Sequence, residues 1–261
     1  MHKLKRGQVT LFVVIGIIVI ILVGALLFTK NNPFSPPQPA QISSEVQEVK
    51  NIIQSCLDQS LFNAIAITAA HGGYYKAPIE NSENSQEQSF IPYYYDQGEV
   101  IIPELSTLTE QLSEAVGEEL GACITFPSNS YSTTSSFEQM QIDTIIKQTT
   151  VQSTVHLPTI IRFPSGEEAK LEVFSSNTKT TYWSFAQLAK ILTVEQSKHP
   201  ETICISCVAT TSEKYNLTTR TEEIIENNDY LHFYYVTSND PIDPVDFFAF
   251  AHRLSLPEEA S

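Results

Sequence analysis

The chain has 261 residues, of which 42% are hydrophobic and 17% are charged, and its formal net charge at pH 7 is −15. This composition is typical of a folded chain and is too apolar for a disordered one. Four of the 15 basic residues lie at or before Lys30 and all 30 acidic residues lie after it, so 11 basic and 30 acidic residues give the later part a charge of −19. Such a surface repels phosphate groups, which argues against nucleic acid and anionic lipid head groups as its partners.

Residues 9–28 (VTLFVVIGIIVIILVGALLF) form an apolar run without a single charge. As a helix it is about 30 Å long, which matches the hydrocarbon core of a bilayer. Lys3, Lys5 and Arg6 precede it, so the positive-inside rule places residues 1–8 in the cytoplasm as a basic segment. A cleaved signal peptide is the competing interpretation, but its apolar part is commonly about 7 to 15 residues and ends at a small-residue site. We therefore expect a transmembrane helix over residues 9–28 that holds the main domain on the extracytoplasmic side of the cell membrane.

The residues in front of the apolar run carry a recognisable pattern, KRGQVT, at positions 5–10. It resembles the class III, type IV pilin-like signal of archaea, which is cut between Gly and Gln. The resemblance implies processing between Gly7 and Gln8 and a pilin-like subunit that assembles through its hydrophobic helix. Pilins usually carry an acidic residue five positions after the cut, where this chain has Phe12. That carboxylate helps pilin subunits to align, so the resemblance supports processing more strongly than filament formation.

A wider resemblance covers about half of the chain. GQVTLFVVIGI at residues 7–17 is followed by Ser55-Cys56-Leu57, Gly72-Gly73-Tyr74, IPYYY at residues 91–95, an acidic helix that ends at Cys123, and FFAFA at residues 247–251. This order is similar to uncharacterised membrane-anchored proteins of small-genome archaea. That family has no established activity, so the resemblance implies placement and architecture but no reaction.

The first part of the expected external domain is mainly helical. Residues 29–41 are rich in proline and predict a linker. Apolar residues between positions 46 and 69 recur at three- and four-residue steps, which predicts an amphipathic helix from about Ser43 that Gly72-Gly73 terminates. A polar loop follows over residues 80–88.

Next we expect a hairpin and a second helix. Strands over residues 89–95 and 99–102 are joined by Asp96-Gln97-Gly98, which is typical of a tight turn. The helix covers residues 105–123 and opens with a capping box from Thr107 to Glu110. Residues 42–126 therefore form a helical subdomain with a hairpin.

The second part changes to β-strand patterning after a serine- and threonine-rich loop at residues 129–136. Residues 137–256 are expected to form a mainly β subdomain with one helix at 184–198 and strands at 140–149, 151–157, 160–163, 169–174, 221–226 and 230–237. The fold class is therefore α+β: a transmembrane helix, then an extracytoplasmic domain of antiparallel sheet packed with helices.

The four cysteines are the strongest chemical signal. An even number in an extracytoplasmic domain favours disulfides among Cys56, Cys123, Cys204 and Cys207, although four cysteines allow three pairings. The CxxC motif at residues 204–207 can also bind metal or act in redox chemistry. A redox CxxC needs its first cysteine at a helix N-terminus, and here the motif follows a helix through His199-Pro200, so we interpret it as a loop or strand with a local disulfide.

The other motifs favour no reaction. Asp240, Asp243 and Asp246 can ligate calcium but lack the spacing of a calcium-binding loop, so we interpret them as a turn-forming run. Asn216 is the acceptor of the N-x-[ST] glycosylation motif. Tyrosines at 93–95 and 230–235 fit either an interface or ordinary strand packing. We assign no catalytic, cofactor-binding or metal-binding residue.

Three functional hypotheses remain at this point. The first is a non-enzymatic, single-pass membrane protein that binds a partner or has a structural role at the cell envelope. The second is a pilin-like subunit processed after Gly7 that self-assembles. The third is an extracytoplasmic thiol-redox protein that uses Cys204 and Cys207.

Overall fold

The structure is a computed structural model that describes residues 44–78, 82–86, 89–127, 131–226, 229–240, 245 and 247–255. These residues belong to one compact unit, Ser44–Ser261. The unit is α+β, with sheets of antiparallel strands packed with helices, which confirms the expected fold class of the domain. The basic segment 1–8, the apolar run 9–28 and the linker 29–41 lie outside the described residues. Among the residues that are described, no helix is long and apolar enough to cross a membrane.

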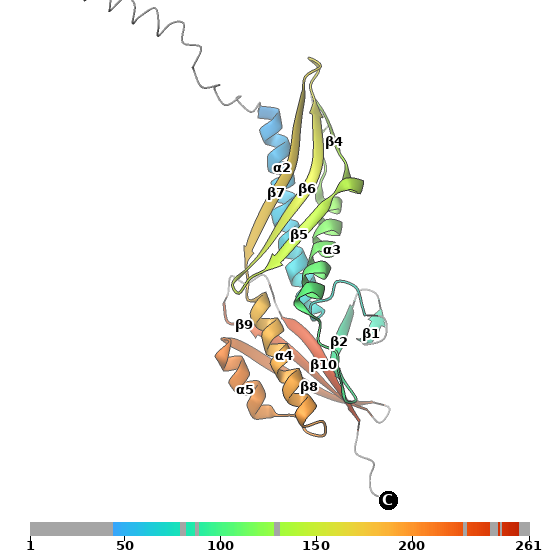
Figure 1. Cartoon of the computed structure of the whole chain (residues 1–261), viewed down its shortest axis with the longest axis vertical. Coiled ribbons are helices and arrows are strands. Elements are labelled where there is room, and N and C mark those ends of the chain that lie inside the picture. The colour runs from blue at the N-terminus through green and yellow to red at the C-terminus, as the bar shows by residue number, and fades with distance from the viewer. Residues whose placement is uncertain are drawn as a thin grey trace, which may run out of the picture. The chain divides into compact units, whose positions relative to one another are not determined.

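Two helices pack against each other in one part of the unit, as Figure 1 shows. Helix α2 (Ser44–Ala70) and helix α3 (Leu105–Cys123) lie side by side and are joined by a disulfide between Cys56 and Cys123. Both helices were predicted, because their apolar residues recur at helical spacing. The predicted capping box is wrong: α3 begins two residues before Thr107, its N-cap residue is Glu104, and no side chain caps it.

The two helices pack on the first sheet, which is entirely antiparallel. Strand β7 (Glu168–Lys179) pairs along nearly the whole of β6 (Thr150–Arg162), whereas β5 (Gln141–Ile146) and β4 (Ser132–Ser135) pair with successive parts of β6. Alternate residues of β6 are buried, from Val151 to Ile161, as expected of a sheet with one face on a core. A short 3-10 helix (Phe137–Gln139) separates β4 from β5.

Two expectations for this sheet were wrong. Residues 151–157 and 160–163 are parts of one strand, and the intervening Pro158 lies where the pairing register shifts. A bulge tolerates proline because no ladder hydrogen bond is required of its nitrogen, and the Pro158 carbonyl accepts a hydrogen bond from the Ser136 amide at 2.9 Å. The loop expected over residues 129–136 contains strand β4.

The second sheet has the order β1-β2-β10-β9-β8, and the short strand β3 also pairs with β2. Strands β2 and β10 are parallel and the other pairs are antiparallel. Its strands are β1 (Ser82–Gln86), β2 (Ser89–Asp96), β3 (Glu99–Val100), β8 (Leu217–Glu226), β9 (Asp229–Ser238) and β10 (Phe248–Ser255).

Helices α4 (Tyr182–Lys198) and α5 (Ile205–Lys214) pack on this second sheet and on each other. The Phe185 ring of α4 stacks on Phe248 of β10, with centroids 5.8 Å apart. The sequence predicted one helix in this part, so α5 corrects that expectation. Strands β1 and β10 were also not predicted, and β1 lies in the expected loop 80–88.

The contacts cross the boundary expected between residues 42–126 and 137–256. Strand β2 comes from the first segment, yet it lies between β1 and β10 in the second sheet, while α2 and α3 pack on strands from the second segment. Each of the two segments therefore contributes elements that pack with elements of the other.

The turn after α2 directs the chain from the helical layer to the second sheet. Gly72 and Gly73 have φ values of +54° and +88°, which L-residues with a side chain rarely adopt. The Gly73 amide donates to the Thr68 carbonyl at 2.7 Å, and the Tyr94 hydroxyl of β2 donates to the Gly72 carbonyl at 2.8 Å. The turn is thus fixed to both α2 and β2.

Replacing Gly73 with alanine is expected to destabilise the fold by about 2 kcal/mol or more, because a Cβ there adds backbone strain to overpacking. That Cβ would lie 2.1 Å from Cδ2 of the buried Leu108. Urea unfolding of the full chain in detergent, followed by the fluorescence of Trp183, the single tryptophan, measures the change. Gly121→Ala is the matched control, since nothing lies within 4 Å of its Cβ position in α3. An equal loss in both variants would contradict this account of the turn.

Candidate functional site

A groove of about 840 Å³ lies at the C-terminal end of α2. We call it the α2–α3 groove; its lining residues are Ile67, Ala70, His71, Tyr75, Lys76, Ala77 and Glu118. It is positioned by the turn after α2, because the two glycines bring residues 74–78 back across α3. Its walls combine apolar side chains with a cation, a carboxylate, a phenol and an imidazole.

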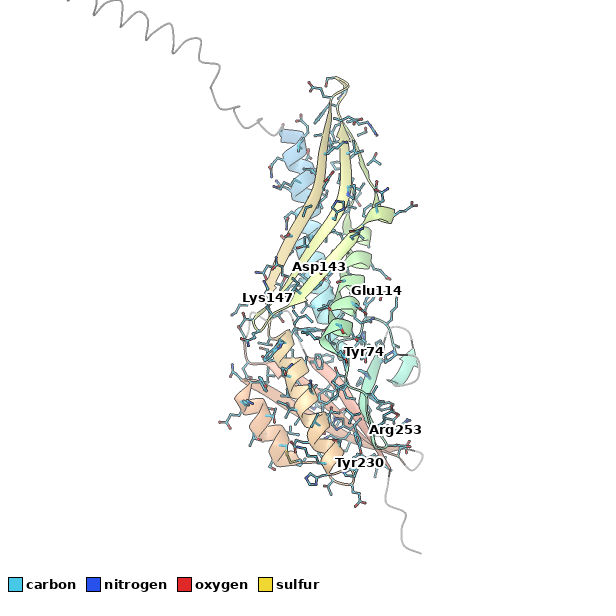
Figure 2. The ribbon with its side chains drawn as sticks, in the orientation of Figure 1. Tyr74, Glu114, Asp143, Lys147, Tyr230 and Arg253 are labelled. Carbon is cyan, nitrogen blue, oxygen red and sulfur yellow. A yellow bond between two sulfur atoms is a disulfide. The ribbon has the colours of Figure 1, made fainter. Side chains whose placement is uncertain are left out.

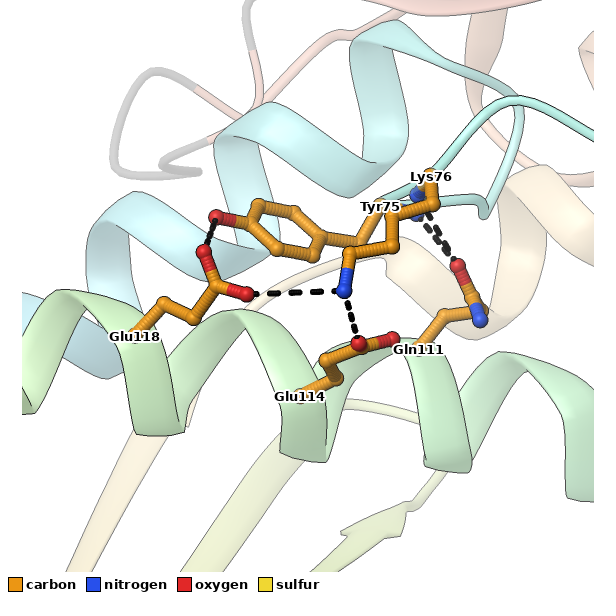
Figure 3. A network of polar contacts seen from close by, with 5 residues as sticks. All are labelled: Tyr75, Lys76, Gln111, Glu114 and Glu118. Atoms are coloured by element: carbon orange, nitrogen blue, oxygen red, sulfur yellow. Dashed lines mark hydrogen bonds and ion pairs between the residues drawn. The ribbon is translucent and has the colours of Figure 1, made fainter.

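The charged groups of the groove are paired with one another (Figure 3). The Lys76 ammonium lies between Glu114 and Glu118 of α3, 3.5 Å from the Glu118 carboxylate, and the Tyr75 hydroxyl donates to Glu118 at 2.9 Å. The Gln111 side-chain oxygen accepts from the amides of Tyr75 and Lys76 at 2.8 and 3.1 Å. This network fixes the loop to α3 and leaves no net positive charge for an anionic ligand.

The protonation states follow from these contacts. Burial, together with the hydrogen bond to Glu118, raises the pKa of Tyr75 to about 12, so its hydroxyl remains a donor at neutral pH. The hydrogen bond to Glu114 raises the pKa of Lys76. Burial lowers the pKa of His71, whose ring stacks on Phe90 with centroids 4.4 Å apart and whose Nδ1 has no partner. His71 therefore lines the groove as a neutral imidazole whose Nδ1 atom is buried.

A second group of imidazoles lies under α4. His232 of β9 and His252 of β10 are direct cross-strand partners, and both are fully buried. Nε2 of His252 is 3.0 Å from the Thr193 hydroxyl of α4, while both ring nitrogens of His232 lack a hydrogen bond. Burial and the neighbouring His232 lower the pKa of His252 to about 3, and burial lowers the pKa of His232 against the opposing effect of Glu223. The pair is therefore neutral at physiological pH and is part of the core.

All four cysteines lie in disulfide-distance pairs, in agreement with the expectation of disulfides. The Cα atoms of Cys56 and Cys123 are 5.6 Å apart, and those of Cys204 and Cys207 are 5.2 Å apart. The expected loop or strand at residues 204–207 is wrong, because Cys204 is the N-cap residue of α5. The Cys207 amide donates to Cys204 Sγ at 3.2 Å, so the motif has the helix-terminal placement that redox CxxC motifs require.

The tyrosines named from the sequence pack in the second sheet. Tyr93, Tyr94 and Tyr95 are all buried. Arg253 lies over the Tyr93 ring and forms a two-point ion pair with Asp96 at 2.6 and 2.5 Å, at the same end of the sheet as Tyr230 (Figure 2). Strand packing therefore accounts for Tyr93–Tyr95, and these residues do not form an exposed recognition surface.

The remaining sequence candidates are dispersed. Asn216 is exposed in the turn before β8, with φ of +54°. Asp240 pairs with Lys179 at 2.7 Å, and Asp243 and Asp246 lie outside the described residues. Within the described part of the chain, no three histidine, cysteine, aspartate or glutamate side chains are placed to hold a metal ion. Gly7 and Gln8 are also outside the described residues.

Comparisons of the chain with protein-family models, with curated proteins and with solved structures find no match. Neither the α2–α3 groove nor the histidine pair was predicted from the sequence. The groove had a local signal, an imidazole directly before a glycine pair, but its α3 side is more than thirty residues away in sequence. The histidine pair depends on the register of β9 and β10, and β10 was not predicted.

Acidification is expected to weaken the fold through His252. Its folded pKa of about 3 lies below the unfolded value near 6.5, so between these pH values the unfolded chain binds more protons and stability falls as pH falls. For this group alone the loss from pH 7.5 to pH 5 is about 2 kcal/mol. Urea unfolding at several pH values, followed by Trp183 fluorescence, measures the slope of the free energy of unfolding against pH.

The variant His252→Gln should reduce the slope, whatever its effect on stability at pH 7.5. His156→Gln is the matched control for the loss of an imidazole, because His156 is exposed on β6. An unchanged slope in His252→Gln would contradict the assignment to this residue.

Proposed function

We propose that the protein is a single-pass membrane protein whose extracytoplasmic α+β domain has a non-enzymatic binding or structural role at the cell envelope. The anchor in this proposal is the apolar run at residues 9–28, oriented by Lys3, Lys5 and Arg6. The observation that supports the external placement best is that all four cysteines lie in disulfide-distance pairs. Disulfides persist in oxidising compartments and are rare in the cytosol of most organisms.

The separation of the first pair along the chain strengthens this point. Cys56 and Cys123 are 67 positions apart, so their bond closes a long loop and stabilises the domain by roughly 4 kcal/mol in the chain-entropy estimate. That contribution is a large fraction of the stability of a typical domain, which is about 5 to 15 kcal/mol. A fold that depends on such a bond is suited to an oxidising compartment.

The α2–α3 groove supports a binding role. Its lining combines apolar side chains with a few polar groups that contact one another: Ile67, Ala70 and Ala77 lie beside the Lys76 ammonium, the Glu118 carboxylate and the Tyr75 hydroxyl. Ligand sites commonly combine an apolar lining with a few fixed polar groups.

The pilin-like alternative rests on the KRGQ pattern and on the helix that follows the linker. Helix α2 packs one face on an antiparallel sheet and so begins the folded domain. A chain cut after Gly7 would carry the apolar run at residues 9–28 ahead of that domain. Sequencing the N-terminus of protein from native membranes separates the two proposals. A start at Gln8 together with filaments favours the subunit, and a start at Met1 or His2 favours the plain anchor.

The anchor is tested by placing two arginines in the apolar run. Ile18→Arg with Ile21→Arg is expected to release the chain from membranes washed with alkaline carbonate, because each arginine near the bilayer centre costs about 3 kcal/mol. The matched control, Ile18→Leu with Ile21→Leu, should remain in the membrane fraction.

The external placement is tested separately on intact cells. A protease added outside should digest the domain, and alkylation without prior reduction should modify neither Cys56 nor Cys123. Survival of the domain, or free thiols at Cys56 and Cys123, would contradict the proposed placement.

A further inference from the structure

The motif at residues 204–207 is placed where disulfide exchange can occur. Both cysteines are only partly buried, and Cys207 packs against the core, whereas Cys204 lies at the start of α5. The gain in stability from a disulfide grows with the length of the loop it closes. Cys204 and Cys207 are 3 positions apart and Cys56 and Cys123 are 67 apart, so the short bond contributes less to the fold than the long one.

The surroundings of Cys204 stabilise its thiolate form. The Cys207 amide donates to Sγ of Cys204 at 3.2 Å, and the Ser206 hydroxyl oxygen lies 3.5 Å from the same sulfur. The N-terminal end of a helix carries partial positive charge, which favours a thiolate there. Cys204 is therefore a good leaving group when a mixed disulfide between Cys204 and a partner is broken.

A groove of about 410 Å³ begins beside the motif and runs between α5 and β8. Ile205, Val208 and Ala209 line its α5 side, and Leu217 and Thr219 line its β8 side. Ile205, next to Cys204, is 61% exposed. Strand β8 is the terminal strand in the described order of its sheet, and such an edge can bind an extended peptide through main-chain hydrogen bonds.

We propose that Cys204 and Cys207 form a thiol–disulfide exchange site whose partner is a cysteine in an extended polypeptide segment bound along the α5–β8 groove. The partner's thiolate attacks Cys204 Sγ, the bond to Cys207 breaks, and Cys207 leaves as a thiolate and takes up a proton. A second thiolate of the partner then attacks the partner sulfur in the mixed disulfide, which releases Cys204 as a thiolate. Two partner thiols become one disulfide, and two electrons pass to the protein.

The redox hypothesis has a structural basis because Cys204 begins a helix. The sequence counted against that hypothesis because the motif was expected to lie in a loop or strand. The exchange site stands apart from the membrane anchor, and the full chain in detergent tests it. In glutathione redox buffers, the Cys204–Cys207 bond is expected to be reduced at a lower ratio of reduced to oxidised glutathione than the Cys56–Cys123 bond, as measured by alkylation and peptide mass. Reduction of both bonds at the same ratio would overturn the proposal.

The sulfur that exchanges with the partner is identified with two matched variants, in which the remaining thiol attacks a peptide disulfide and the exchange runs in reverse. Cys207→Ser leaves Cys204 as the only thiol of the motif, and Cys204→Ser leaves Cys207. The probe is a short peptide whose single cysteine, between two leucines, carries a nitrothiobenzoate group in a mixed disulfide; release of that group is followed by its absorbance. Cys207→Ser is expected to react at least tenfold faster than Cys204→Ser at neutral pH, because Cys204 begins α5 and its thiol is more ionised there, whereas Cys207 packs against the core. Equal rates would overturn the assignment of Cys204.

The groove is tested in the Cys207→Ser background. Adding Ile205→Ser should slow the peptide reaction about fivefold, the effect of losing part of one isoleucine contact, and leave the reaction with glutathione carrying the same group unchanged. Ile225→Ser, at another exposed isoleucine that does not line the groove, should change neither rate. An unchanged peptide rate in the Ile205→Ser variant would overturn the peptide site, and Trp183 fluorescence verifies that every variant is folded.

Discussion

Burial of the apolar face of α2 is the contact on which the rest of the unit depends. Val49, Ile53, Leu57 and Leu61 are fully buried along it, and this one helix contacts α3, β7 and β10. Each fully buried aliphatic side chain of this size contributes about 1.5 to 3 kcal/mol. Among the described elements, α2 is the one that packs closely on strands of both sheets, and the disulfide from Cys56 to Cys123 holds α3 against the same helix.

The turn at Gly72-Gly73 connects α2 to the second sheet. A residue with a Cβ at Gly72 would meet the Ala249 carbonyl oxygen of β10 at 2.6 Å, so the backbone of the turn is in close contact with the second sheet. Tyr94 adds a hydrogen bond from β2 to the same turn. The α2–α3 groove lies directly after this turn, so its geometry depends on the conformation of Gly72 and Gly73.

The parts of the fold that the sequence predicted are those with a strong local period. Helices α2 and α3 have long apolar stripes, and the hairpin at Gln97-Gly98 has two residues with positive φ in the turn, as the Asp-Gln-Gly signal indicated. Helix α5 was missed because ISCVATTSEK is rich in β-branched and hydroxyl residues with weak helix propensity. Its helical state depends on packing of Val208 and Thr211 against the unit and on Cys204 at its N-terminus.

Long-range pairing explains the other differences between expectation and structure. Strand β10 pairs with β2 across more than 150 positions, as the ion pair of Arg253 with Asp96 shows, and no local pattern contains that partner. The α2–α3 groove and the histidine pair arise from the same kind of contact, so the sequence showed at most one side of the groove and nothing of the pair. The CxxC motif was visible, but its chemistry depends on whether a helix begins at Cys204. Residue types identified the candidate sulfur atoms, and only the tertiary packing of α5 places Cys207 against the core and Cys204 at the start of the helix.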